Sequence, residues 1–440
     1  MARAKKEASL TPEERFQAAL VPDWEWSYKL PENWCWTYLG VVSEIVMGQS
    51  PAGKSTTNDS SYMPLIGGAA DMGELYPQVS RFTKTPTKQS QTDDVILSIR
   101  ATLGRPIFSD GIYCLGRGVV AFRSSIVTKE FLRYFFIDQE NYLYQNATGT
   151  TFAQVDSKTL KSMPFPLPPF HEQRRIVRRV KSLFTKLDEA KEKAQAVVDS
   201  FEIRKAAILH KAFTGELTAK WREEHGVSID NWKTTRFDSV AAIRSNLVDP
   251  AEYQSFPHIA PDNIEKKTGV LLEYHTIAED GVTSGKHRFY SGQILYSKIR
   301  PYLSKAVVVD FDGLCSADMY PIEAYQNARC LWYYMLSDEF LLQASTAGSR
   351  SVLPKINQKE LSALTVHLPT NDREQEEIAR ILDELFDKEQ QTKEAAEIVL
   401  DQIELMKKSI LARAFRGELG TNDPSEESAV ELLKKVLEKK

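Results

Sequence analysis

Residues 172–217 read EQRRIVRRVKSLFTKLDEAKEKAQAVVDSFEIRKAAILHKAFTGEL, and residues 374–419 read EQEEIARILDELFDKEQQTKEAAEIVLDQIELMKKSILARAFRGEL. Aligned without a gap, roughly 21 of 46 positions are identical. Each copy follows a Leu-Pro dipeptide and a segment of about 150 residues with the composition of a folded domain. These two segments resemble each other far less than the two copies do. The contrast predicts that the repeat makes one contact twice, whereas the segments make two different contacts.

Both copies carry apolar residues at alternating intervals of four and three positions, which is typical of a coiled coil. Polar residues interrupt the pattern at Arg204 in the first copy and at Glu389 and Thr392 in the second. Each copy is predicted to form a helix of about 40 residues, with Gly215 and Gly417 as C-terminal caps. The predicted seam residues are Ile176, Val180, Leu183, Leu187, Val197 and Phe201 in the first copy, and Ile378, Leu382, Leu385, Val399, Ile403 and Met406 in the second.

The two copies differ in charge. The first contains 11 Lys and Arg against 7 Asp and Glu, and the second contains 7 against 12. Opposite charges favour pairing of the two helices within one chain, in an antiparallel coiled coil. Two unrelated surface helices, or the seam of a homodimer, are the alternatives. The sequence thus predicts an α+β protein, in which two long helices separate two globular α/β domains.

The predicted segments follow from the repeat. Composition agrees, because 440 residues with 42% hydrophobic residues suffice for two or three folded domains. The segments are an N-terminal extension (1–20), a first globular domain (21–166), a first repeat helix (167–217), a second globular domain (218–367), a second repeat helix (368–419) and a C-terminal tail with a short helix (420–440).

Targeting and redox signals are few. No stretch is long and apolar enough to span a bilayer, and the charged N-terminus lacks the apolar core of a secretion signal. We therefore expect a cytoplasmic protein. The four cysteines are far apart and no histidine cluster accompanies them, so we expect reduced packing residues and no metal site; they are Cys35, Cys114, Cys315 and Cys330.

The globular segments share a strand and turn, DDVILSIRATLGRP at 93–106 and GQILYSKIRPYLSK at 292–305. Aligning the two runs pairs Ile99 with Ile299, Leu103 with Leu303, Arg100 with Arg300 and Arg105 with Lys305, and it also places Cys114 opposite Cys315.

Both segments also end alike, in TGTTFAQVDSKTLKSMPFPLP at 148–168 and AGSRSVLPKINQKELSALTVHLP at 347–369. Each run is predicted to form a small polar loop, a short helix and an edge strand. Small polar loops of this kind can approach a phosphate backbone closely.

Loops of both globular segments interleave Lys and Arg with Ser, Thr, Gln, His and Tyr. This mixture suits DNA, because cations contact phosphates while amide and guanidinium groups read base edges. A solvated loop is the alternative for any single residue. The predicted DNA-contacting residues are Gln49, Ser50, Lys54, Arg81, Thr83, Lys84, Lys88, Arg100, Thr102, Arg105, Thr150 and Gln154 in the first segment, and Lys266, Lys267, Lys286, His287, Arg288, Lys298, Arg300, Tyr302, Ser349 and Arg350 in the second.

The run GQSPAGKS at 48–55 satisfies the phosphate-loop pattern. Phosphate binding there requires a helix after the loop, whose N-terminus faces the phosphates. The next residues, STTNDSSYMPLIGG, are poor helix formers, so we reject a nucleotide site and expect a polar loop near DNA. LPPF at 167–170 lacks the Asn or Asp of an amino-methyltransferase tetrapeptide, and no nuclease cluster is evident.

Several runs together resemble the specificity subunit of type I restriction-modification systems. They are PLIGGAADMG at 64–73, SIRATLG at 98–104, YSKIRPYLSK at 296–305, LCSADMYPI at 314–322 and the AFxGEL endings of both repeats. The resemblance implies two target-recognition domains, each reading one half of an asymmetric, bipartite site in double-stranded DNA. It implies a coiled coil that sets the spacing and docks two methyltransferase subunits.

The same resemblance implies no catalytic site on this chain. S-adenosylmethionine, ATP and magnesium are expected on partner subunits, which include motor-nuclease subunits in the full complex. The alternative functions are a phosphate-loop ATPase using Lys54 and Ser55, or a coiled-coil adaptor that binds no DNA. Two segments depart from the resemblance: residues 1–20 look basic and unpatterned, and 424–440 predict an amphipathic helix, for which we favour partner contact over packing.

Overall fold

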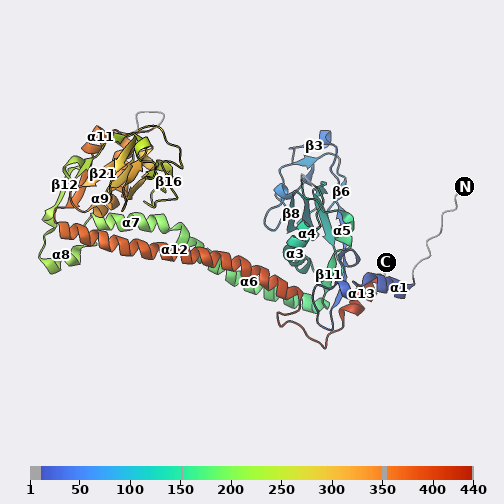
Figure 1. Ribbon diagram of the computed structural model, residues 1–440. Coiled ribbons are helices and arrows are strands. Elements are labelled where there is room, and N and C mark those ends of the chain that lie inside the picture. Colours follow the sequence, from blue (N-terminus) through green and yellow to red (C-terminus); the bar gives the residue numbers. More distant parts are fainter. Residues whose placement is uncertain (1–10, 150–151, 349–353, 439–440) are drawn as a thin grey trace. The chain divides into compact units, whose positions relative to one another are not determined.

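The computed structural model describes residues 11–149, 152–348 and 354–438 (Figure 1). It divides into two compact units. The first comprises Met1–Lys193 and Val399–Lys440, and the second comprises Ala194–Ile398. Each unit contains one globular domain of strands and helices and one stretch of paired long helices, so the predicted α+β architecture is confirmed.

The first globular domain is built on a four-stranded antiparallel sheet in the order β2-β10-β7-β8. Its central strand reads VILSIR and is buried on both faces, as its nearly continuous apolar sequence requires. Leu97 and Phe122 face the helices, where Phe131 packs. The elements are β2 (Glu44–Met47), β7 (Val95–Arg100), β8 (Thr102–Phe108), β10 (Val119–Arg123), α3 (Lys129–Asp138) and α4 (Glu140–Gln145).

A five-stranded sheet of short strands covers the other face, in the order β3-β5-β4-β9-β6. Ile96 and Ala121 point toward it and pack with Ile66 and Leu115. Strands β4 and β9 run parallel, which places their carboxyl ends at one edge of the domain. The strands are β3 (Thr56–Thr57), β4 (Met63–Ile66), β5 (Phe82–Thr83), β6 (Lys88–Gln89) and β9 (Cys114–Leu115).

The second globular domain repeats this plan. Its four-stranded sheet has the order β13-β21-β18-β19, and its five-stranded sheet has the order β14-β17-β20-β15-β16. Helices α9 (Ala328–Met335) and α10 (Asp338–Ala347) pack on the four-stranded sheet. The strands are β13 (Ala241–Ile243), β14 (Leu247–Val248), β15 (Pro257–Ile259), β16 (His275–Thr276), β17 (Lys286–Phe289), β18 (Ile294–Ser297), β19 (Ala306–Val308), β20 (Gly313–Cys315) and β21 (Met319–Ala324).

The alignment that pairs Arg100 with Arg300 is wrong by one residue. The backbone N–H of Arg300 donates to the Pro354 carbonyl, just as that of Ala101 donates to Ala153. Ala101 and Arg300 also share a left-handed backbone, with φ of 65° and 48°. Arg300 is therefore the structural counterpart of Ala101. The second domain has one extra residue after this point, which restores the predicted match of Arg105 with Lys305.

The cysteines are buried and unpaired, as predicted for packing residues. Burial raises the pKa of Cys35 and Cys315 to about 12, so neither thiol is reactive near neutral pH. Cys114 and Cys315 are not equivalent, however. Cys315 pairs with Ile259 across parallel strands, and the matching pair in the first domain is Leu115 with Ile66.

Both globular segments close as predicted, with a short helix followed by a strand. The last strand pairs with the first strand of the same segment in a separate two-stranded sheet. This pairing brings the start of each repeat helix beside the entry of its globular domain. The elements are β1 (Cys35–Tyr38), α2 (Leu39–Val42), α5 (Ser157–Lys161) and β11 (Pro164–Leu167), and then β12 (Trp232–Arg236), α11 (Gln358–Ala363) and β22 (Thr365–Pro369).

The first repeat is two helices rather than one. Helix α6 (Phe170–Asp199) ends before Ser200, and α7 (Phe201–Phe213) follows directly. The Arg204 side chain donates to the Val197 carbonyl at 3.3 Å, which satisfies an acceptor at the break. The second repeat is one continuous helix, α12 (Asp372–Phe415). Gly215 and Gly417 lie just past the helix ends with φ of 79° and 74°, which confirms both caps.

The helices pair in antiparallel fashion within each unit, as predicted. In the first unit, Lys191 of α6 contacts Glu404 of α12 at 2.6 Å, and Lys407 bonds Asp188. In the second unit, Arg204 of α7 bonds Glu389 of α12 at 2.7 Å. Two of the polar interruptions of the apolar pattern are thus partners of each other.

The predicted seam is correct for most of its residues but wrong for Val399 and Met406. These side chains are 40% and 49% exposed. Leu400 and Lys407 turn inward instead, and the Lys407 ammonium lies 5.5 Å from the ring centre of Phe184. The long Lys407 stem occupies a position that the sequence pattern assigned to a methionine.

The described terminal segments, residues 11–20 and the helix near the C-terminus, pack against the first globular domain. Residues 11–20 are not unpatterned, because α1 (Pro12–Ala19) opens with a capping box at Thr11. Helix α13 (Ala429–Leu437) buries Ala429 and Leu433 in the core of the first domain, so the tail has a packing role within the chain. No helix among the described residues is long and apolar enough to cross a membrane.

Candidate nucleic-acid interface

The parallel strands β4 and β9 place two glycine-rich turns side by side in the first domain. Residues 67–71 follow β4, and residues 116–118 follow β9. A Cβ atom on Gly118 would lie 2.4 Å from the Gly67 carbonyl oxygen, and one on Gly116 would lie 3.0 Å from the Gly67 Cα. The close approach of the two turns therefore requires glycine, and it exposes little side-chain bulk at this edge.

A buried carboxylate organises the edge. Asp71 Oδ2 accepts the backbone N–H of Gly67 at 2.7 Å and the Nη2–H of Arg81 at 2.9 Å. The Asp71 side chain is buried, whereas half of the Arg81 side chain is exposed. Arg81 is thus anchored at one nitrogen and open to solvent elsewhere.

These groups line a concavity of about 520 Å³. Arg100 enters it from the end of β7, and Arg117 enters from the turn after β9. Thr102 and the exposed ring of Phe152 complete the polar and aromatic lining. Among the described residues, neither Arg100 nor Arg117 has a side-chain hydrogen bond or ion pair. A cationic, partly aromatic hollow of this kind suits phosphate and base edges.

The second domain carries a different cationic group at the corresponding edge. Lys298 donates to the Ala317 carbonyl, and its ammonium lies 5.1 Å from the ring centre of Tyr320. Lys355 bonds Asp318 at 3.2 Å. Burial, and then the charge of Lys355, lowers the pKa of Lys298. A cation held in this way gains from a nearby phosphate, because the phosphate offsets both effects.

Three predicted contact residues are buried, so their prediction is wrong. Thr83 lies within β5, where its hydroxyl is 3.4 Å from that of Ser55. Lys286 and His287 lie in β17, and the Lys286 ammonium donates to Ser284. Burial lowers the pKa of both groups, and the charge of Lys298 further lowers that of His287. The sequence showed basic residues but not that this strand is covered.

Other predicted residues have partners within the chain. Arg105 donates to the carbonyls of Ala69 and Met72, so it holds the loop beside the concavity. Arg288 is half-buried, with its guanidinium 4.9 Å from the ring centre of Tyr290. Arg105 is nonetheless exposed, whereas Arg288 is half-buried.

Of the remaining described residues of the predicted set, Arg100 is half-buried and the others are exposed; Arg81, Arg100 and Thr102 lie together at the concavity. Thr150, Ser349 and Arg350 lie outside the described residues. The exposed ones elsewhere stay predictions; they are Gln49, Ser50, Lys54, Lys84, Lys88, Gln154, Lys266, Lys267, Arg300 and Tyr302.

The sequence reasoning missed Asp71, Arg117, Phe152 and Lys355. Arg117 lies in a Gly-Arg-Gly run, which was an available signal for an exposed cation on a tight turn. Asp71 gave no such signal, because its importance depends on Arg81, which lies ten residues later in the sequence and just before β5.

The structure does not support a nucleotide site at the loop 48–55. A 3-10 turn over Gly53–Ser55 and the short strand β3 follow the loop, in place of the helix that a phosphate site requires there. Among the described residues, no group of three or more His, Cys, Asp or Glu is arranged to hold a metal ion.

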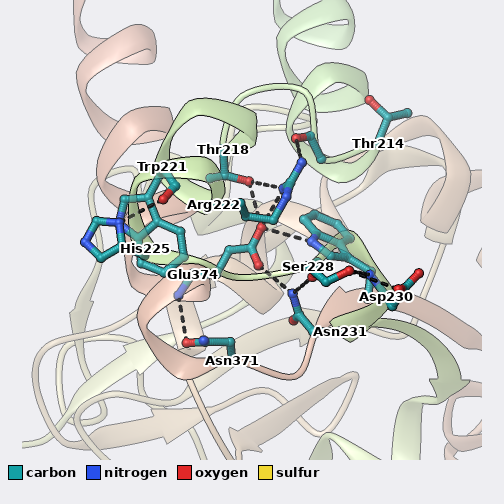
Figure 2. A network of polar contacts seen from close by, with 12 residues as sticks. Thr214, Thr218, Trp221, Arg222, His225, Ser228, Asp230, Asn231, Asn371 and Glu374 are labelled. Atoms are coloured by element: carbon teal, nitrogen blue, oxygen red, sulfur yellow. Dashed lines mark hydrogen bonds and ion pairs between the residues drawn. The ribbon is translucent and has the colours of Figure 1, made fainter.

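A second polar network anchors each repeat helix to its globular domain. Glu374 begins the buried turn of α12 and accepts four hydrogen bonds from side chains, as Figure 2 shows for Thr218, Arg222 and Asn231. The indole of Trp232 donates the fourth at 2.9 Å. Arg222 comes from α8 (Ala219–His225), just beyond the end of the first repeat. The Glu374 carboxylate therefore joins the start of the second repeat helix to the segment after the first repeat and to the second globular domain.

Glu172 holds the equivalent place in the first repeat. It accepts from the Trp34 indole at 2.7 Å, from Asn422 at 2.9 Å and from Thr421 at 3.3 Å. No arginine among the described residues forms an ion pair with Glu172, and burial raises its pKa. Burial acts on Glu374 as well, but hydrogen bonds from Asn231, Arg222 and others outweigh it, so its pKa is lowered.

The next residue of each repeat makes a matching contact. Gln173 accepts the backbone N–H of Thr128, which caps α3, and Gln375 accepts that of Asn327, which caps α9. The Glu-Gln pair at the start of each repeat thus fastens the helix to its domain by the same bonds twice.

Comparison with known families agrees with a chain in which one globular domain and one helix each occur twice. The family model described as the type I restriction modification DNA specificity domain matches residues 31–198 and again 229–399. The two matches together cover more than half of the chain. The chain belongs to this family.

Similar proteins are specificity subunits of type I restriction enzymes. The chain is 37% identical over 340 residues to the EcoDI specificity subunit of Escherichia coli, covering 71% of this chain and 76% of that protein. It is 24% identical over 433 residues to the EcoKI specificity subunit of E. coli strain K12, covering 85% and 88%. This chain is accordingly a specificity subunit of a type I restriction-modification system, and not a catalytic subunit.

Solved structures support the fold of this specificity subunit. A chain from a study of complex assembly and conformational transition of the type I system aligns with a TM-score of 0.69 and 19% identity, over 89% of this chain and all of that one. The HsdS subunit from Thermoanaerobacter tengcongensis aligns with a TM-score of 0.60 and 20% identity, over 90% and 99%.

Proposed function

We propose that each recognition domain of this specificity subunit binds one half of an asymmetric, bipartite site in double-stranded DNA. The main supporting observation is that the two globular domains share one strand order but have different side chains at corresponding edges. The first offers Arg81, Arg100 and Arg117, and the second offers Lys298 and Lys355. Unlike side chains on like frames favour unlike half-sites.

The repeat helices are proposed to dock two methyltransferase subunits. Ile203 and Leu405 occupy the same position of the two repeats, and they are 72% and 65% exposed. A large aliphatic side chain that is exposed at equivalent places on two helices favours one apolar contact made twice. Motor-nuclease subunits would join in the full complex, and S-adenosylmethionine, ATP and magnesium would act on the partner subunits.

The helix pair is further proposed to set the distance between the half-sites. Helix α12 is continuous across 44 residues and takes part in both units. A continuous helix has a fixed rise of about 1.5 Å per residue, so its length does not adapt to the DNA. The target should therefore tolerate little change in the gap.

Competition binding tests DNA recognition against the two alternatives. The subunit, in complex with its methyltransferase partners, is titrated with target and scrambled duplexes over a series of salt concentrations. We expect affinity for both to fall with salt, because phosphate contacts release counterions, and a preference for the target to persist. Absence of sequence preference at every salt concentration would contradict recognition. ATP binding by the isolated chain that Lys54→Ala abolishes would favour the ATPase alternative.

A further inference from the structure

We propose that Arg81 reads the edge of a guanine base, with Asp71 as the residue that positions it, and that Arg117 contacts phosphate. The inference rests on the proposed DNA recognition and assigns roles within the concavity of the first domain. It concerns which cation determines specificity and which supplies affinity alone.

The position of Arg81 is fixed from two sides. Its Nη2 donates to the buried Asp71 carboxylate, which is itself held by the Gly67 N–H. On the other side, a Cβ atom on Gly67 would lie 2.6 Å from that same nitrogen, so the guanidinium packs directly against the glycine. A guanidinium has five N–H donors, and among the described residues only one donates here. The others remain for a ligand in a defined orientation.

The charge of Asp71 argues against phosphate as that ligand. A carboxylate 2.9 Å from the guanidinium cancels much of its attraction for an anion and repels a phosphate placed nearby. A base edge is neutral, and the O6 and N7 acceptors of guanine match two N–H donors of an oriented arginine. Orientation is valuable for reading a base, whereas a phosphate contact needs little of it.

Arg117 has the opposite character. It is exposed on the Gly116–Gly118 turn, and among the described residues no carboxylate pairs with its guanidinium. Its charge is uncompensated and its orientation is not fixed by a hydrogen bond. These properties suit a phosphate contact that is independent of sequence.

Substituting Asp71→Asn separates the two roles, because asparagine keeps an oxygen for the Gly67 N–H but removes the negative charge. The complex of the subunit with its methyltransferase partners is used to select duplexes from a randomised pool. The wild type is expected to require guanine at one position of the half-site read by the first domain. Asp71→Asn is expected to reduce that preference roughly 5-fold to 150-fold without lowering total DNA binding.

Two further variants complete the test. Arg81→Lys retains the charge but loses the paired donors, so it is expected to relax the same position. Arg117→Ala is expected to leave the selected sequence unchanged, to weaken binding to all duplexes and to reduce the salt dependence by about one phosphate. The half-site read by the second domain is the internal control, because it must stay unchanged in every variant that is folded.

The outcomes distinguish this inference from the proposed function. If the wild type selects no sequence, DNA recognition itself fails, and the inference fails with it. If the wild type selects a bipartite site but Asp71→Asn and Arg81→Lys keep every position, only the assignment of Arg81 is wrong. A uniform gain in affinity for Asp71→Asn with an unchanged site would make Arg81 a phosphate contact, and selection of a half-site without guanine would also overturn the assignment.

Discussion

At the residue scale, the repeat places two glutamates in equivalent positions, but their surroundings shift the two pKa values in opposite directions. Glu374 has a buried ion pair with Arg222 at 2.7 Å, whereas Glu172 has neutral donors. The lowered pKa of Glu374 means that its contribution to stability is present at neutral pH and is lost as the pH falls through that value. The raised pKa of Glu172 means that its ionisation weakens the fold as the pH rises through its own value.

Matched substitutions should therefore have unequal effects. Glu374→Gln leaves the Arg222 charge buried without a counterion, and we expect a loss of up to about 3–5 kcal/mol in the stability of the second unit. Glu172→Gln keeps an acceptor for Trp34 and removes no ion pair, so we expect a change below about 1 kcal/mol. Hydrogen exchange at pH 7 of peptides covering 215–235 and 30–40 measures the two effects separately. Equal losses in both variants would show that the arginine is unimportant.

Individual contact residues were the hardest part to predict from sequence. Arg81 and Arg100 were identified by residue type, and the fold brings them together. Thr83 and His287 have equally suitable chemistry but lie on covered strands. Asp71 could not be predicted, because its contact with Arg81 depends on the pairing of β4 with β5, which the sequence pattern does not indicate.

At the element scale, the repeat was far more predictable. Heptad spacing and charge indicated antiparallel pairing, and Lys191–Glu404 and Arg204–Glu389 are such pairs. The pattern failed at Val399, because an inward Lys407 shifts which residues of α12 face the seam. The pattern also missed the break at Ser200, because no Gly or Pro marks it in the sequence. The Arg204 side chain donates to the Val197 carbonyl, which the break leaves without a helical partner.

The exposed aliphatic pair allows a test of partner docking. Ile203→Glu and Leu405→Glu each add a charge to an exposed position, so folding should be preserved while an apolar contact is lost. We expect each single variant to bind one methyltransferase subunit instead of two, and the double variant to bind neither tightly. Mass measurement of the purified complex gives the stoichiometry. The exchange Ile203→Leu with Leu405→Ile retains apolar surface and is the control; full binding by the double Glu variant would exclude this surface.

At the scale of the whole molecule, the chain joins two versions of one domain plan to two copies of one helix. The duplication of the helix was evident from the sequence, because the two copies are identical at roughly 21 of 46 positions. The shared plan of the globular domains was less evident, since it lies in strand order and in the left-handed residues Ala101 and Arg300. The N-terminal helix α1 was not predicted, and the C-terminal helix was expected to contact a partner, whereas α13 packs in the core of the first domain. An amphipathic pattern shows that a helix has an apolar face but not which surface covers that face.

Mapping methylated adenines in the host genome, with and without this gene, tests the central claim most directly. We expect the gene to add one methylated sequence made of two unlike half-sites separated by a gap of fixed length. The unlike halves would reflect the different side chains of the two domains, and the fixed gap would reflect the continuous helix. A methylation pattern that is unaffected by the gene, a symmetric target, or a gap of variable length would contradict the account.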